Sequence, residues 1–142
     1  MSLETGHYLI HNGGKFVSRS FTEDRTLSPK NVDLLEPSDR ESTWIIEKTD
    51  DGYILNNRGA PTTHIDDHIF ALLINQGSAT KWNIEAVPQH GEGKYIITSE
   101  GKGWVAPDNV NEQIGYSALV VEGSSDKPTY QKKAVFEIIK LE

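Results

Sequence analysis

The chain has 142 residues, of which 36% are hydrophobic, and it contains no cysteine. This length suffices for one domain with a sizeable core, and the lack of cysteine excludes disulfides, thiolate nucleophiles and cysteine-based zinc sites. The formal net charge of −7 disfavours nucleic acids, heparin-like polymers and anionic membranes as partners, because their recognition requires clustered lysine and arginine.

Alternating apolar and polar residues run along the whole chain, rich in β-branched and aromatic types and separated by glycine and asparagine turns. No window shows sustained helical periodicity, and the longest apolar run, residues 69–74, is too short to span a bilayer. The predicted class is therefore all-β. In chain order, the pattern predicts twelve short strands at residues 8–11, 16–20, 32–36, 44–47, 53–56, 61–65, 70–75, 81–86, 95–98, 103–106, 117–122 and 135–140.

A short phrase occurs three times in the chain and marks a structural repeat. A glycine, a tyrosine and aliphatic residues follow one another at 6–10, 52–55 and 93–97, and the first glycines are 46 and 41 residues apart. Since so short a unit cannot bury its own apolar face, the three units must share one core. Three units of four strands predict a β-trefoil, with a six-stranded barrel and a hairpin cap, as a single domain over residues 1–142. Six aromatic residues are expected at equivalent core positions: Tyr8, Tyr53 and Tyr95, and separately Trp44, Trp82 and Phe136.

The units differ most in the connection between their second and third strands. In the first unit this connection runs from Thr22 to Asn31, whereas the matching segment of the second unit is a short turn. A long surface loop on a rigid barrel is a usual place for binding function. Arg25 lies near its middle, and Pro29 restricts its own backbone and that of Ser28, which favours an extended, stiff segment.

A stiff loop that displays one long cationic side chain is suited to bind a trypsin-like protease, because the S1 pocket of such enzymes has an acidic residue at its base. A loop that is already extended loses little entropy when it docks. The alternative interpretation is that Arg25 is a solvated charge paired with Glu23 or Asp24, and composition alone favours this alternative.

Five long phrases, at residues 1–6, 44–48, 53–62, 101–108 and 137–142, resemble the fungal β-trefoil protease inhibitors called mycospins and mycocypins. The resemblance runs end to end. It implies a serine protease inhibitor, not an enzyme, that needs no cofactor and acts as a monomer on trypsin-like serine proteases. Because the run Glu23-Asp24-Arg25 matches the family pattern, the resemblance implies that Arg25 is the primary specificity residue. The reactive bond would then be Arg25–Thr26, supported by Glu23, Asp24, Leu27, Ser28 and Pro29.

The sequence contains only weak indications of metal-binding or catalytic sites. The stretch from His64 to His68 has metal-binding residue types, but an exposed turn is the simpler interpretation, so no metal is expected. Neither a nucleophile elbow nor a glycine-rich phosphate loop is present, which disfavours an enzyme. Residues 1–6 carry no basic start and no apolar run, so we expect no secretory signal and a location inside a fungal cell.

Two alternative functions stay open. The first is a sugar-binding β-trefoil lectin, which would usually carry Gln-x-Trp. The chain lacks this tripeptide, so a sugar site would be of a new kind, on Trp104 or Tyr116. Related mycocypins also inhibit papain-like cysteine proteases, and asparagine-specific proteases through a hairpin of the second unit. Asn56 and Asn57 occupy a comparable hairpin here, where a turn-forming role is the simpler interpretation. If Arg25 were not the reactive residue, Lys30 and then Arg58 would be the next candidates.

Overall fold

The structure is a computed structural model that describes residues 3–38, 42–123 and 126–141. Three helices of this part are single 3₁₀ turns, and no helix in it has the length and apolar character that a membrane crossing requires. The helices are η1 (Gln76–Ser78), η2 (Pro88–His90) and η3 (Lys132–Ala134). The strands are β1 (Gly6–Asn12), β2 (Lys15–Arg19), β3 (Lys30–Leu35), β4 (Trp44–Thr49), β5 (Gly52–Asn57), β6 (Ala60–Ile65), β7 (His68–Ala71), β8 (Asn83–Ala86), β9 (Lys94–Ser99), β10 (Lys102–Val105), β11 (Glu112–Gln113), β12 (Gly115–Ala118), β13 (Val121–Glu122), β14 (Thr129–Tyr130) and β15 (Phe136–Lys140).

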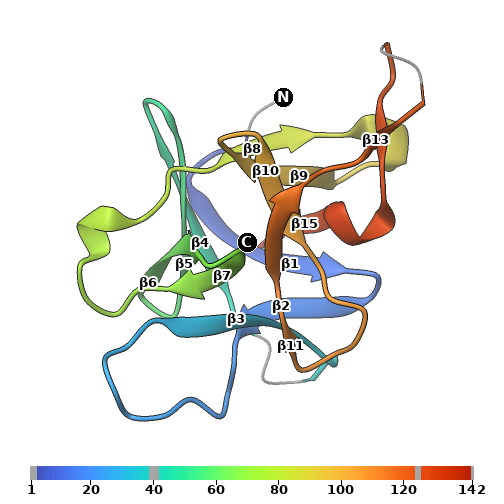
Figure 1. The fold of residues 1–142 in the computed structure, drawn as a ribbon. Coiled ribbons are helices and arrows are strands. Elements are labelled where there is room, and N and C mark those ends of the chain that lie inside the picture. The colour runs from blue at the N-terminus through green and yellow to red at the C-terminus, as the bar shows by residue number, and fades with distance from the viewer. Residues whose placement is uncertain (1–2, 39–41, 124–125, 142) are drawn as a thin grey trace.

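The strands close on themselves (Figure 1). In the order β1, β15, β9, β10, β12, β7, β6, β5 and β4 each strand pairs with the next, and β4 pairs back with β1, so nine strands form a closed circuit. Outside this circuit, β2 pairs with β1 and β3, β3 pairs also with β7 and β11, and β8 pairs with β9. Strands β13 and β14 form a separate two-stranded sheet. Closure gives most strands two partners and leaves few exposed edges.

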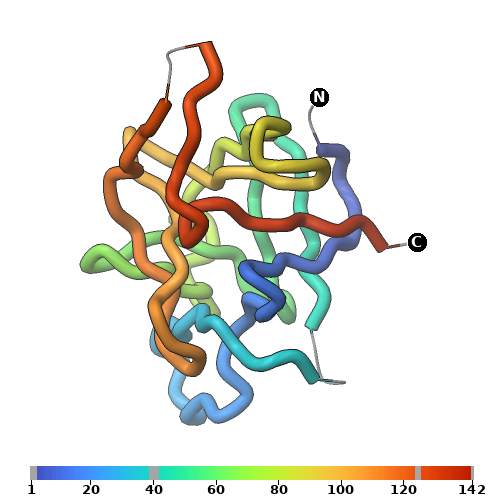
Figure 2. The backbone as a smooth tube through the Cα atoms, turned by 90° about the vertical axis from the view of Figure 1, so that its right-hand side faces the viewer, coloured from blue at the N-terminus to red at the C-terminus, as the bar shows by residue number. Residues whose placement is uncertain are grey.

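All twelve predicted strands overlap strands of the structure, and the all-β class is confirmed. Two of them are wrong in extent. The strand predicted at 70–75 ends at Ala71, because the chain turns into η1 through Asn75, whose φ of 55° is left-handed. The strand predicted at 117–122 ends at Ala118, and Val121 and Glu122 instead pair with β14 in a separate ribbon that projects from the molecule (Figure 2).

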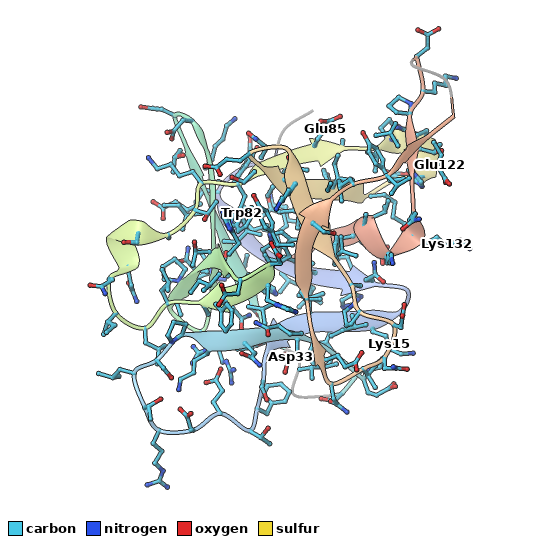
Figure 3. The ribbon with its side chains drawn as sticks, in the orientation of Figure 1. Lys15, Asp33, Trp82, Glu85, Glu122 and Lys132 are labelled. Atoms are coloured by element: carbon cyan, nitrogen blue, oxygen red, sulfur yellow. The ribbon has the colours of Figure 1, made fainter. Side chains whose placement is uncertain are left out.

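The repeated aromatic residues face one another across neighbouring strands. Tyr8 lies opposite Trp44, Tyr53 opposite Trp82 and Tyr95 opposite Phe136. Trp44, Trp82 and Phe136 are fully buried, Tyr8 and Tyr53 are buried, and Tyr95 packs against the same cluster while staying partly exposed. Figure 3 shows Trp82 in the interior of the molecule. The expected shared core is therefore present.

Trp104 is the centre of this core, a role that the repeat did not predict. Its ring lies 5.9 Å from that of Trp44, 5.5 Å from that of Trp82 and 6.2 Å from that of Phe136. The contacts with Trp82 and Phe136 are edge-to-face, the arrangement that aromatic quadrupoles favour. One tryptophan thus connects the closing aromatic residues of all three units.

Candidate functional site

The long loop of the first unit connects β2 to β3 and covers residues 20–29. The predicted span from Thr22 to Asn31 was wrong at its end, because Lys30 and Asn31 belong to β3 and pair with Ala71 and Phe70 of β7. The loop projects from one end of the molecule (Figures 1 and 2). Most of its side chains are exposed, and its two ends leave paired strands, so the barrel fixes where it begins and ends.

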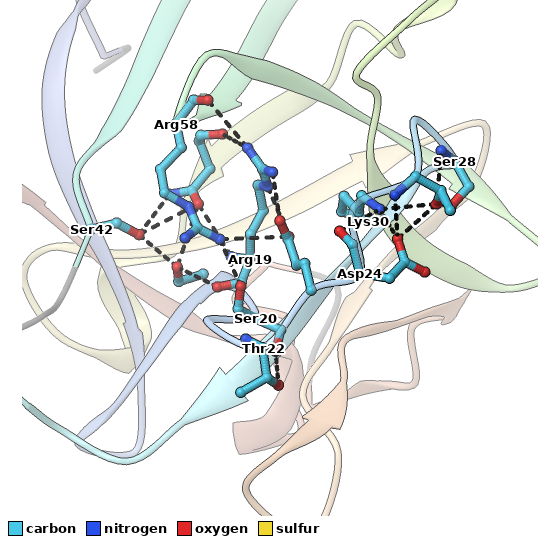
Figure 4. Close-up of polar contacts among 12 residues, drawn as sticks. Arg19, Ser20, Thr22, Asp24, Ser28, Lys30, Ser42 and Arg58 are labelled. Atoms are coloured by element: carbon cyan, nitrogen blue, oxygen red, sulfur yellow. Dashed lines mark hydrogen bonds and ion pairs between the residues drawn. The ribbon is translucent and has the colours of Figure 1, made fainter.

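A buried arginine holds the first limb of the loop (Figure 4). Arg19 donates from Nε to Glu23 Oε2 at 3.0 Å and from Nη2 to Glu23 Oε1 at 2.7 Å, a bidentate pair. Its Nη1 donates to the Arg58 carbonyl oxygen at 3.2 Å. Arg58 in turn donates from Nη2 to the Ser20 carbonyl oxygen at 2.8 Å and lies 3.5 Å from Glu23 Oε2. The limb is therefore fastened to the β5–β6 turn.

The two arginines share one carboxylate. Burial lowers the pKa of Arg58 and the nearby Arg19 lowers it further, while Glu23 acts in the opposite direction. The side chain of Glu23 is itself only 16% exposed. Because a half-buried pair of cations needs an anion between them, Glu23 has a structural role in the loop rather than a role at its surface.

Asp24 and Thr26 brace the tip of the loop from within. Asp24 Oδ1 accepts from the Thr26 amide at 3.0 Å and from Thr26 Oγ1 at 2.7 Å. Lys30 also donates from Nζ to Asp24 Oδ1, and to Thr26 Oγ1 at 3.3 Å. The hydrogen bond from Lys30, and then those from Thr26, lower the pKa of Asp24 to about 2. Asp24 therefore stays ionised at neutral pH and keeps these bonds.

Arg25 lies between these two braced residues and is exposed. In the described part of the chain it makes no hydrogen bond and no ion pair, because Glu23 is engaged by Arg19 and Asp24 by Lys30. The alternative interpretation, in which Arg25 pairs with Glu23 or Asp24, is therefore wrong. The loop presents one free guanidinium on a backbone that its neighbours hold.

The loop bends where the sequence predicted an extended segment. Residues 25–28 form a continuous bend. The cause is a set of local hydrogen bonds: those that Thr26 donates to Asp24 Oδ1, and a contact of 2.6 Å between Thr26 Oγ1 and Ser28 Oγ. Bonds between residues two apart in sequence curve the backbone. The stiffness expected from Pro29 is thus supplied by an internal hydrogen-bond network.

Lys30 and Arg58, the two other candidates for the reactive residue, do not expose a free charged group as Arg25 does. Lys30 is only 4% exposed and its ammonium group points into the loop, where it holds Asp24 and Thr26. Arg58 is bound to Ser20 and Glu23, and its guanidinium lies 5.4 Å from the ring centre of Phe21. Both side chains support the loop that carries Arg25.

The residues behind the alternative functions are mostly interior. Asn57 is fully buried, and its Oδ1 accepts from the Arg19 amide at 3.2 Å, so it supports the base of the loop. Trp104 and Tyr116, considered for sugar binding, are 0% and 4% exposed and offer no stacking surface. Asn56 is partly exposed and donates from Nδ2 to the Ile45 carbonyl oxygen at 3.3 Å.

The two histidines of the second unit have separate partners. The His64 ring stacks on Tyr116 with ring centres 4.0 Å apart, and His68 Nδ1 lies 2.9 Å from the Asp66 carbonyl oxygen. Among the residues that the structure describes, no group of three or more histidine, cysteine or acidic side chains is arranged to hold a metal ion.

One buried acid beneath the loop was missed by sequence reasoning. Asp33 on β3 is 7% exposed, and its Oδ1 has no hydrogen-bond partner within the described protein. Desolvation, with a smaller contribution from Glu23, raises its pKa to about 6. It lines a polar cavity of about 310 Å³ together with both limbs of the loop. In the alternating pattern of this strand, Asp33 takes a position that is expected to face solvent, so nothing in the sequence indicated that it is buried.

Comparison with known proteins gives consistent likenesses. The family model described as Peptidase inhibitor I66 matches residues 1–140. A protein from Lentinula edodes named "Serine protease inhibitor" is 64% identical over 99% of this chain and 100% of its own length. The structure of a proteinase inhibitor from Coprinopsis cinerea is similar with a TM-score of 0.89 and 32% identity, covering 99% of this chain and 100% of that one. A designed threefold-symmetric protein, ThreeFoil, is similar in fold alone, with a TM-score of 0.69 and 17% identity over 96% of this chain and 99% of that one.

Proposed function

The chain belongs to the peptidase inhibitor I66 family, and from that premise we propose that it inhibits trypsin-like serine proteases by presenting Arg25 to the active site. The family is one of inhibitors rather than of enzymes. The resemblance drawn from the sequence phrases is confirmed by the family match and by the relatives. The observation that carries the proposal is the free guanidinium of Arg25 between two braced neighbours.

Arg25 has the chemistry that an S1 pocket with an acidic base selects. Its guanidinium enters the pocket, and the bond between Arg25 and Thr26 lies at the catalytic serine. A rigid, exposed loop docks with little loss of conformational entropy, so more of its contact energy appears as affinity. The hydrogen bonds among Asp24, Thr26 and Lys30 already fix this geometry in the free protein.

The same brace would make the loop resist turnover by the protease. Cleavage would release Thr26 as the amine of the leaving segment. The Thr26 amide and hydroxyl are held by Asp24, and Lys30 at the start of β3 holds both residues. The new amine would therefore stay beside the acyl group and could re-form the bond faster than water replaces it.

The test is a titration of trypsin and chymotrypsin with variants at position 25. Arg25→Lys should keep trypsin inhibition, because a cation of similar reach remains, whereas Arg25→Glu should abolish it by setting two carboxylates together. Arg25→Leu or Arg25→Phe should shift preference toward chymotrypsin, whose S1 slot is apolar. We expect a loss of roughly 2–5 kcal/mol on removal of the charge.

A matched control is Lys132→Glu, which makes the same change of charge at an exposed cation on η3. It should inhibit trypsin as the parent does. Inhibition by Arg25→Glu at the parent's strength would contradict the assignment and move the reactive residue elsewhere.

We further propose that the fold is a β-trefoil and that the inhibitor acts as a monomer. Six strands, β1, β4, β5, β8, β9 and β15, are linked in a ring by strand pairings and by the bridge between Tyr53 and Trp82. The hairpins β2–β3, β6–β7 and β10–β12 are joined by pairings of β7 with β3 and with β12. The likeness to a designed threefold-symmetric protein supports the same arrangement. A crystal structure in which Trp44, Trp82 and Phe136 fail to superpose under a threefold rotation would contradict it, and sedimentation would test the monomer.

A further inference from the structure

An apolar groove lies beside the β2–β3 loop and shares a wall with it. The groove has a volume of about 620 Å³ and is lined by residues 27–29 of the loop, by β6 and by the segment after β7. Three of its side chains are exposed aliphatic groups: Leu27, Ile65 and Ile74 are 62%, 37% and 50% exposed. Exposed apolar side chains gathered in one place commonly mark a contact surface.

Strand pairing sets the groove against the loop. Lys30 and Asn31 at the end of the loop pair with Ala71 and Phe70 of β7, so the segment that follows β7 runs beside the last loop residues. Figure 1 shows the loop and the segment around η1 projecting on the same side of the molecule. Leu27 belongs to both the loop and the groove.

The far wall of the groove is preformed. Gln76 Nε2 donates to the Leu72 carbonyl oxygen at 3.3 Å, and Asn75 takes a left-handed conformation with φ of 55°. The Oγ1 atoms of Thr63 and Thr80 lie 2.8 Å apart and tie β6 to the chain beyond η1. A partner would therefore meet a surface that needs little ordering.

The chemistry of the groove restricts its occupant. No lysine, arginine, aspartate or glutamate lines it, and its one titratable side chain, His64, stacks on Tyr116. A charged group placed there would lose water without gaining an oppositely charged partner. The groove therefore favours an uncharged surface that is largely apolar.

The size of the loop indicates which molecule provides that surface. The loop has ten residues, whereas a stable protein complex usually engages about 20–30 residues on each side. A protease docked on the loop must therefore also contact neighbouring surface. Because Leu27 follows Arg25 by two residues, the groove lies on the side of the leaving segment.

We propose that the groove receives an apolar, uncharged surface of the same protease, beside the part of its active site that holds the leaving segment. This inference rests on the proposed function, in which Arg25–Thr26 is the reactive bond. It adds a second contact region, centred on Ile65 and Ile74, to the loop itself.

The first experiment uses the absence of cysteine. Ile74→Cys can carry an environment-sensitive fluorophore at that position alone. Added trypsin should shift its emission to the blue as the groove becomes covered. Val121→Cys, on β13 and 58% exposed in the parent, is the matched control and should not respond. Adding Arg25→Glu to the labelled Ile74→Cys protein should remove the shift, because the loop no longer docks.

The second experiment uses unlabelled protein. Ile74→Asp and Ile65→Asp should weaken trypsin inhibition roughly tenfold, mainly through faster dissociation, while Val121→Asp should stay within about twofold of the parent. Both groove positions are exposed, so thermal unfolding should change little and will show whether the variants fold.

The outcomes separate the two proposals. If Arg25→Glu loses inhibition while Ile74→Asp and the Ile74 label behave as the controls do, the groove contact is wrong and the proposed function stands. If Ile74→Asp loses inhibition and Arg25→Glu does not, the protease contacts the groove but the reactive residue lies elsewhere, which overturns the placement of the groove beside the leaving segment. Failure of the parent to inhibit trypsin overturns both. A dimer of the free chain that Ile74→Asp dissociates would assign the groove to a second copy and overturn the protease contact.

Discussion

Asp33 lies beneath the loop with a carboxyl oxygen that no donor of the described protein reaches. Its pKa of about 6 lies above the value of an unfolded aspartate, about 3.8, because burial disfavours the ionised form. Its contribution to stability is therefore fully present below pH 3.8 and is lost as the pH rises through 6. At neutral pH the charged carboxylate destabilises the folded protein.

Asp33→Asn is accordingly expected to stabilise the protein at pH 8. A shift of about two units corresponds to roughly 3 kcal/mol, which hydration at the edge of the polar cavity reduces to about 2 kcal/mol. The gain should disappear at pH 4. Urea unfolding at both pH values measures it, with the exposed Asp108→Asn as the control. A loss of stability at pH 8 would show that Asp33 has a partner that requires its charge.

Asp24 has the opposite behaviour, because its partners hold its pKa near 2, below the ordinary value of 3.8. The brace on the loop is therefore complete above pH 3.8 and is lost as the pH falls through 2. The amide proton of Thr26, which donates to Asp24, should report this change. Its NMR resonance is expected to titrate with a midpoint near pH 2. In Asp24→Asn the titration should vanish, and a midpoint near pH 4 in the parent would mean that the brace does not form.

The β2–β3 loop is built so that its supports lie on the strands that flank it. Arg19 ends β2 and Lys30 begins β3, and each is buried while its charged group reaches into the loop. The supports are therefore fixed by strand pairing, and the loop residues follow them. Inhibitory strength should depend on these two buried cations as well as on Arg25.

The variant Lys30→Met distinguishes the support that Lys30 gives to the β2–β3 loop from its effect on the stability of the protein. Methionine keeps the aliphatic stem, and the freed Asp24, whose side chain is 66% exposed, can be solvated by water. We expect unfolding free energy to change by less than about 1 kcal/mol, because the pair is partly exposed. Trypsin inhibition should weaken roughly tenfold and the loop should be cleaved faster, since its geometry is no longer preset. Lys15→Met, a matched change at an exposed pair on β2, should alter neither. Unchanged inhibition by Lys30→Met would show that the brace has no part in binding.

The sequence predicted the position of this loop more successfully than it predicted the residues that support the loop. Glycine turns and alternation located the strands, because both depend on local backbone preference. Lys30 was assigned to the loop, since a lysine is ordinarily solvated, and only the pairing with β7 buries it. Asn57 was interpreted as a turn residue, yet its side chain contacts the Arg19 amide of another unit. Such partners are set by tertiary contacts that no local pattern contains.

At the scale of the molecule, three sequence units meet at Trp104. Its ring contacts the closing aromatic residue of each unit, yet its Nε1 has no hydrogen-bond partner within the described protein. Trp44, by contrast, donates from Nε1 to the Val17 carbonyl oxygen at 2.8 Å. Both tryptophans are fully buried, but in the described protein only Trp44 has a hydrogen-bond acceptor for its indole nitrogen.

This difference predicts that substitutions at Trp104 and at Trp44 lower the unfolding free energy by different amounts. Trp104→Ala should reduce the unfolding free energy by about 3–5 kcal/mol, through loss of burial and a cavity at the centre of the core. Trp104→Phe should cost less than Trp44→Phe, because only the latter leaves a carbonyl group without its donor. Denaturant unfolding of the three variants measures this order. The reverse order for the two phenylalanine variants would mean that the Trp104 indole has a partner, such as a bound water molecule.

The isolation of Arg25 has an evolutionary consequence. Its side chain makes no hydrogen bond or ion pair in the described chain, whereas its neighbours form the hydrogen bonds that shape the loop. Selection for a new target can therefore replace this one residue without penalty to folding. A library randomised at position 25 should yield proteins of nearly equal melting temperature and divergent protease preference. Stability would then reside in the strands and the braced neighbours, and recognition in one exchangeable side chain.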